Sequence, residues 1–297
     1  MKIRVAVVVL GLLSFVPCAS LGQMTSMNAS VGTDGRYSIT AQFAPPSFSL
    51  PAISGAPYSA DQVSEHTQTL NDGTHVSQPP PGTLHMYRDS AGRTRTERPF
   101  IFGPRGQTPG LPLLVEINDP VAGYQLILDT VNRVAHRSAL PPRPERARAA
   151  PLTGGVPGGS PTGRIPGGVI SSSAGTVYGP AAAGAPPGFG MRPDVSSESL
   201  GTQVIEGILV EGRLSKVTHP VGTMGNDRPI VTTSEDWMSP ELRVMVLSKS
   251  SDPRSGEHTT RLININRAEP DAGLFQVPPD YQIVDETGPF TIKIERP

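Results

Sequence analysis

Short runs in which apolar and polar residues alternate are the feature that most constrains how this chain can fold. Phe290, Ile292 and Ile294, for example, alternate with Thr291 and Lys293. Successive side chains of a strand point to opposite faces of a sheet, so this period-two pattern predicts half-buried strands. Outside the first 22 residues no amphipathic helix longer than about two turns is expected, and residues 60–70 are its best candidate.

Glycine and proline divide the chain, because they make up 23 of the 53 residues from Pro141 to Pro193. Such a stretch cannot bury enough apolar surface to offset its ordering entropy, so we expect a disordered linker over 141–199. Residues 23–61 are also expected to be mostly flexible, with one possible strand at Tyr37–Phe43. Two β blocks remain, 62–140 and 200–297.

Turn signals join the predicted strands into hairpins. Asp89–Gly92 separates two β-favouring runs, Gly212 separates two more, and Ser239–Glu241 precedes another. Neither block alone buries a large core, so one shared sheet is favoured over two domains. The predicted fold class is mainly β: a curved antiparallel sheet or half-barrel built from hairpins and interrupted by the disordered Gly/Pro-rich insertion.

The first residues have the composition of a secretory signal peptide. Lys2 and Arg4 precede an apolar run, Val5–Val16, which is too short to span a bilayer, and small residues follow it. Residues 1–22 are therefore predicted to be removed, which leaves no stable membrane span and a periplasmic or secreted protein. Lipidation at Cys18 is not expected, since small residues normally stand directly before a lipidated cysteine.

Composition narrows the chemistry that the mature chain can perform. Cys18 is the only cysteine, so cleavage beyond it leaves no disulfide, cysteine-ligated metal or cysteine nucleophile. The formal net charge of −1 argues against a nucleic-acid-binding protein, which needs a clear basic excess.

Catalytic and metal-binding motifs are not recognised. The six histidines have no metal-ligand spacing, and neither a nucleophile elbow nor a phosphate-binding loop occurs. Glu235 and Asp236 are adjacent, so on a strand they point to opposite faces and cannot act as one acid–base pair. No metal, no cofactor and no enzymatic activity are predicted. Four arginines flank one hairpin and are expected on a solvated strand face: Arg88, Arg93, Arg95 and Arg98.

Several short phrases carry a family resemblance. They are Tyr87–Arg95, Ile117–Pro120, Tyr124–Asp129, Glu235–Leu242 and Leu274–Tyr281. They resemble a series found in uncharacterised exported β-rich bacterial proteins, and the arrangement is distantly similar to the periplasmic lipoprotein-carrier class. The resemblance implies a curved antiparallel sheet around an acyl chain, and it assigns no functional residue.

Three aromatic residues, Trp237, Phe275 and Tyr281, are candidates for the lining of an apolar cavity. The preferred hypothesis is an exported, non-enzymatic envelope protein that binds an apolar, lipid-like ligand or a lipoprotein. The alternative is a structural or assembly accessory that acts through contacts with other envelope proteins. A hydrolase with a dispersed triad is the third hypothesis.

Overall fold

The computed structural model describes residues 23–31, 37–49, 51–70, 72–78, 82–99, 113–142 and 193–296. The predicted signal peptide, 1–22, and residues 143–192 of the predicted linker lie outside these ranges. The first nine strands are β1 (Gln23–Val31), β2 (Tyr37–Ala44), β3 (Tyr58–Thr69), β4 (His75–Gln78), β5 (Leu84–Arg88), β6 (Thr94–Pro99), β7 (Leu113–Asp119), β8 (Tyr124–Asp129) and β9 (Val134–Ala139). The later elements are β10 (Asp194–Ile205), β11 (Ile208–His219), β12 (Ile230–Ser239), β13 (Val244–Asp252), β14 (Gly256–Asn266), the 3-10 helix η1 (Ala272–Phe275), β15 (Gln282–Glu286) and β16 (Phe290–Arg296).

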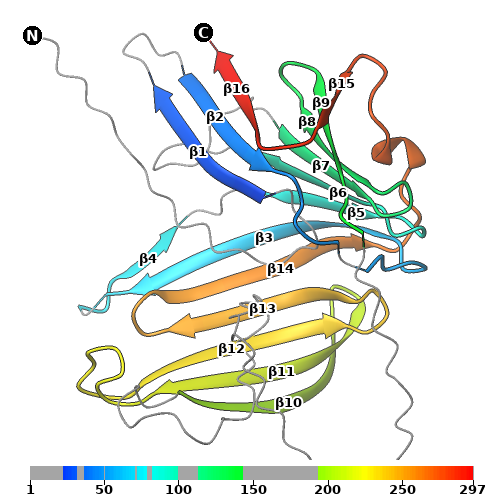
Figure 1. Cartoon of the computed structure of the whole chain (residues 1–297). Coiled ribbons are helices and arrows are strands. Elements are labelled where there is room, and N and C mark those ends of the chain that lie inside the picture. Colours follow the sequence, from blue (N-terminus) through cyan, green and yellow to red (C-terminus); the bar gives the residue numbers. More distant parts are fainter. Residues whose placement is uncertain are drawn as a thin grey trace, which may run out of the picture.

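Most strands belong to one large curved sheet (Figure 1). Its order is β10-β11-β12-β13-β14-β3-β5-β6-β7-β8-β9-β15, and β4 pairs with β3 beside this path. Neighbours are antiparallel except β15, which runs parallel to β9. Because β10 and β15 at the two ends do not pair, the sheet is not closed into a barrel. The mainly β prediction and the curved sheet built from hairpins are confirmed.

The pairing of β3 with β14 joins the two predicted blocks. It runs from Glu257 opposite Thr67 to Asn266 opposite Ser59, with one irregularity after Ile263. The possible helix at 60–70 is wrong, because these residues form most of β3 in the middle of the sheet. Among the described residues no helix is long and apolar enough to cross a membrane.

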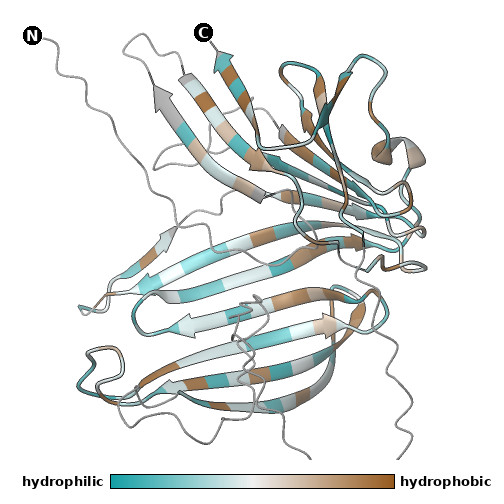
Figure 2. Ribbon diagram, in the orientation of Figure 1, coloured by the Kyte–Doolittle hydropathy of each residue, from teal (hydrophilic) through white to brown (hydrophobic). Residues whose placement is uncertain are grey.

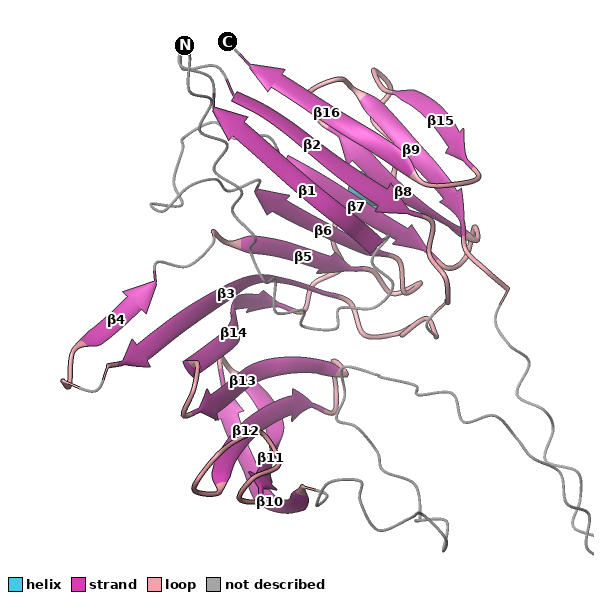
Figure 3. Ribbon diagram, turned by 60° about the vertical axis from the view of Figure 1, so that its left-hand side comes forward, coloured by secondary structure: helices cyan, strands magenta, loops and turns pink. Residues whose placement is uncertain are grey.

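A second, three-stranded sheet, β1-β2-β16, lies against the first half of the large sheet (Figure 3). Ile39 and Phe43 of β2 and Ile292 of β16 pack with Leu114 and Ile127 of the large sheet. The expectation of a mostly flexible segment over 23–61 therefore differs from the structure, where β1, β2 and the start of β3 form. The predicted strand at Tyr37–Phe43 corresponds to β2, but β1 has too few apolar residues for its pattern to be read.

Another core cluster lies between β7, β8, β9 and the segment around η1. Phe275 is buried there with Ile117, Leu126 and Leu128, and Tyr281 packs against the same cluster. The C-terminal elements thus contact the N-terminal half of the chain, although the sequence assigns them to the second block.

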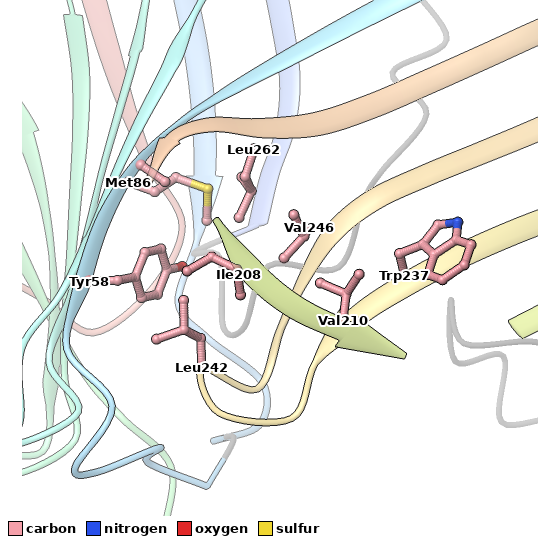
Figure 4. Close-up of a cluster of buried hydrophobic side chains, with 9 residues drawn as sticks. Tyr58, Met86, Ile208, Val210, Trp237, Leu242, Val246 and Leu262 are labelled. Carbon is pink, nitrogen blue, oxygen red and sulfur yellow. The ribbon is translucent and has the colours of Figure 1, made fainter. Parts of the chain in front are cut away.

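The second half of the sheet curls strongly. Ile208 of β11 shares a buried cluster with Tyr58 of β3 and Met86 of β5, although three strands separate β11 from β3 in the sheet (Figure 4). Figure 2 shows that the hydrophobic residues of β13 and β14 gather at one end of these strands and that the other end is hydrophilic. The curl is therefore packed near the β10–β11 turn.

Polar side chains fix several of the hairpin turns. Asp119 Oδ1 accepts hydrogen bonds from the backbone N–H groups of Val121 and Ala122, and Asp129 Oδ1 does the same for Val131 and Asn132. The predicted turn at Asp89–Gly92 is present between β5 and β6. The predicted hairpin around Gly212 is wrong, because that glycine lies inside β11.

Candidate functional site

The outer strand β10 is the most accessible part of the large sheet. Every residue from Asp194 to Val204 is exposed, and only Ile205 is half-buried. Among the described residues β10 pairs with β11 alone. In an antiparallel pair every second residue turns its N–H and C=O away from the neighbour, so β10 presents a row of unpaired backbone groups.

This edge has few of the features that normally prevent strand addition. Proteins protect sheet edges with proline, lysine, short strands or bulges. β10 has twelve residues and contains no proline, lysine or arginine. Within the described ranges its protection is limited to two acidic residues and one bulge, where Leu200 has no partner between Ser199 and Gly201. The opposite edge, β15, has only five residues.

The register with β11 assigns the side chains of β10 to two faces. Residues directly opposite each other share a face, and Asp194, Ser196 and Glu198 lie opposite Thr218, Lys216 and Leu214. We call this side of β10 the acidic face. Val195 lies opposite Val217 and Val204 opposite Leu209, which places both valines on the other side, called here the valine face. Val195 is 54% exposed and Val204 is 67% exposed.

A cleft of about 270 Å³ lies in the curl beside the β10–β11 turn. It is lined by Glu65, Ile205, Glu206, Leu247, Lys249, Thr259, Arg261 and Leu262. Its volume is slightly below the roughly 300–1,000 Å³ of typical small-molecule pockets. Another depression, of about 310 Å³, is lined by Ser49, Pro120, Gly123, Leu140, Pro141 and Pro142, none of which carries a charge.

The charged groups of the 270 Å³ cleft are solvated. Arg261 Nη2 lies 3.3 Å from Glu65 Oε1, and both side chains are about half exposed. Such a pair contributes little to stability. Glu206 occupies the turn with φ of 49°, a left-handed conformation that asparagine or glycine adopts more easily.

The three aromatic residues predicted to line one cavity do not meet. Trp237 belongs to the cluster in the curl, whereas Phe275 and Tyr281 belong to the cluster around η1. None of the three lines either cleft. The sequence could not reveal this separation, because the residues lie on elements whose sheet positions are set by long-range pairing.

The polar residues considered for chemistry make structural contacts. Glu235 Oε1 accepts a hydrogen bond from Trp237 Nε1 at 2.6 Å, and Asp236 accepts from Ser234 and Ser248. Glu235 and Asp236 thus bond to different partners.

Three of the four arginines beside the first hairpin make internal contacts instead of lying on a solvated face. Arg88 is 4% exposed, and its guanidinium donates to the carbonyl oxygens of Ala56 and Leu242. Arg93 and Arg95 bond to Asp89 and Glu97 respectively. For these three the expectation of solvation was wrong, because each guanidinium has nearby oxygen acceptors. Three of these acceptors come from distant segments of the chain: Ala56 O and Leu242 O for Arg88, and Leu274 O for Arg95.

The histidines do not assemble a metal site among the described residues, where no group of three metal-ligating side chains occurs. His258 Nε2 lies 3.2 Å from Thr260 Oγ1, close to His66. Burial, and to a lesser degree the nearby His66, lowers the pKa of His258. Two other histidines, His85 and His136, contact Asp61 and Glu286. Neither of the two clefts contains a histidine.

Comparison with known proteins gives no family. No family model matches the chain, and no curated protein matches it. Among solved structures, an uncharacterized conserved protein from Thermus thermophilus is similar with a TM-score of 0.36 and 8% sequence identity. The match covers 78% of this chain and 91% of that chain.

Proposed function

We propose that this chain is an exported, non-enzymatic protein of the bacterial envelope that binds another protein by strand addition at β10. In strand addition an extended segment pairs with an exposed sheet edge, so backbone hydrogen bonds supply affinity and side chains supply specificity. The observation that carries the proposal is the exposure of β10 along both faces, together with its having one neighbouring strand, β11, in the part of the chain that the structure describes.

The packing of the curl supports a protein partner over a large apolar ligand. Ile208, Val210 and Trp237 are buried where a ligand inside the curl would otherwise sit. The adjoining cleft is small and has four charged residues in its lining. A protein partner at the outer edge needs no rearrangement of this core.

A smaller apolar ligand remains the second candidate function. Ile205, Leu247 and Leu262 give the 270 Å³ cleft an apolar surface, as a carrier of acyl groups would require. Native mass spectrometry of the purified chain tests this candidate. A bound lipid of constant mass that disappears in Leu247→Asp supports it, and a ligand-free spectrum under gentle ionisation contradicts it.

Site-specific photo-cross-linking in the exporting cell tests the strand-addition proposal. A photoreactive amino acid replaces Ser197 or Thr202 in β10, and, as the control, the exposed Thr291 in β16. We expect one adduct of the same mass from both β10 positions and none from Thr291. An equal yield from all three positions, or no adduct from β10, would contradict the proposal.

A further inference from the structure

We infer that the partner segment is basic: it carries lysine or arginine at two positions four residues apart, opposite Asp194 and Glu198. This inference rests on the proposed strand addition at β10 and specifies the chemistry of the partner. The evidence lies in the charges of the edge, in its two faces and in its lack of cations.

The acidic face of β10 holds two carboxylates that are not neutralised. Asp194 and Glu198 are exposed, and neither takes part in an ion pair within the described part of the chain. Lys216 lies on the same face, opposite Ser196 and diagonal to both carboxylates, and it also forms no such pair there. A strand added outside β10 would place its own side chains directly opposite Asp194 and Glu198, closer than the diagonal Lys216.

The spacing of the two carboxylates fixes the pattern of the partner. Asp194, Ser196 and Glu198 lie on one face, so the residues opposite the two carboxylates are four positions apart on the added strand. On the added strand, the residues that alternate with these positions point to the other side of the sheet. They lie beside the valine face of β10, where Val195 is exposed. A β-branched apolar residue opposite Val195 completes the match.

The same charges disfavour a second copy of this chain as the occupant. β10 contains no lysine or arginine, so two β10 strands paired together would supply no cation from either strand to the four carboxylates at their junction. The edge fits a segment of a different protein in which basic and β-branched residues alternate.

The probe is a fluorescent peptide containing Lys-Thr-Thr-Val-Lys, and its matched control replaces both lysines with glutamate. Binding to the full chain is measured by fluorescence anisotropy at low and high salt. Because each opposed charge pair in a sheet contributes modestly, we expect the basic peptide to bind roughly five-fold more tightly, with the difference shrinking at high salt. The double variant D194K/E198K should reverse the preference, and Asp227→Lys in the exposed β11–β12 loop should not.

Two further measurements separate the inference from the proposal beneath it. Peptides N-methylated at one set of alternate residues should lose binding and those methylated at the other set should keep it, because only one edge of an added strand faces β10. If both charge variants bind equally but follow this methylation pattern, the basic partner is wrong and strand addition stands. If neither peptide binds, or if sedimentation shows a dimer that D194K/E198K abolishes, the basic partner is also wrong. The cross-linking experiment decides strand addition independently.

Discussion

Gly212 lies beneath the indole ring of Trp237, and it illustrates how a single residue can be fixed by a neighbour on another strand. A Cβ atom added at Gly212 would lie 2.5 Å from Trp237 Cζ3. The ring cannot move freely, because its Nε1 donates to Glu235. The close approach of ring and backbone therefore requires glycine at this position.

We predict that Gly212→Ala lowers the free energy of unfolding by about 2 kcal/mol, as overpacked core sites do. Urea denaturation followed by Trp237 fluorescence measures the change. Gly288→Ala is the matched control, since nothing lies within 4 Å of its added Cβ. A change in Gly212→Ala no larger than in the control would mean that the ring moves aside at little cost.

The contribution of Asp252 to the stability of the fold depends on pH. The Arg254 guanidinium hydrogen-bonds the carboxylate and, with the Arg254 N–H, lowers its pKa from 3.8 to about 2 although partial burial opposes ionisation. A carboxylate whose pKa is lower in the folded protein stabilises the fold at pH values above its ordinary pKa. This contribution is lost as the pH falls from about 4 through 2.

We therefore expect Asp252→Asn to be less stable than the natural chain at pH 7 and to lose less stability between pH 4 and pH 2. Thermal unfolding at a series of pH values checks this. Asp194→Asn, an exposed carboxylate without an ion pair in the described residues, serves as the control and should keep the natural profile. Parallel profiles for Asp252→Asn and the natural chain would refute the role of this carboxylate.

The β10–β11 hairpin shows which strands and turns could be predicted from the sequence and which could not. The strands expected at Tyr37–Phe43 and around Phe290–Ile294 correspond to β2 and β16, in each of which one face is buried. The sequence pattern predicts this turn at Gly212, because glycine is common in turns. The same residue type is also required at a position under an aromatic ring. The true turn, Glu206–Gly207, was not recognised, because glutamate is rarely found at positive φ.

Relief of this backbone strain should stabilise the hairpin. We predict that Glu206→Asn raises the free energy of unfolding by about 1 kcal/mol, because asparagine tolerates the left-handed conformation that a two-residue turn demands. Chemical denaturation measures the gain. Glu211→Asn, in the extended part of β11, is the control and should be neutral or destabilising. Equal effects at both positions would show that charge, not backbone conformation, determines the result.

At the scale of the whole molecule, Arg88 links the two halves of the sheet. Its buried guanidinium stacks over the Tyr58 ring at 4.7 Å and donates to Ala56 O in one half and Leu242 O in the other. Sequence patterns could not reveal this link, nor the packing of β15 and β16 against the N-terminal half, because both depend on which distant strands become neighbours. The separation of Trp237 from Phe275 and Tyr281 has the same cause.

Arg88→Met is expected to destabilise the fold by about 3 kcal/mol, since two buried carbonyl groups lose a charged donor. The loss should appear as one cooperative transition, because β3 and β14 pair across the two halves. Urea unfolding monitored by Trp237 fluorescence and by circular dichroism tests both points, with the exposed Arg228→Met as control. Transitions that separate between the two probes would instead indicate that the halves unfold independently.

The position of β16 beside β2 also determines when the protein can fold. Phe290 of β16 stacks on Phe43 of β2, with ring centroids 5.3 Å apart, although nearly the whole described chain separates them. β16 is synthesised after all the other described strands. Ile39 and Phe43 therefore lack their packing contacts with β16 throughout synthesis. Contacts this distant along a polypeptide form slowly. The cluster around Ile39 and Phe43 is therefore completed only after residue 296 has been synthesised.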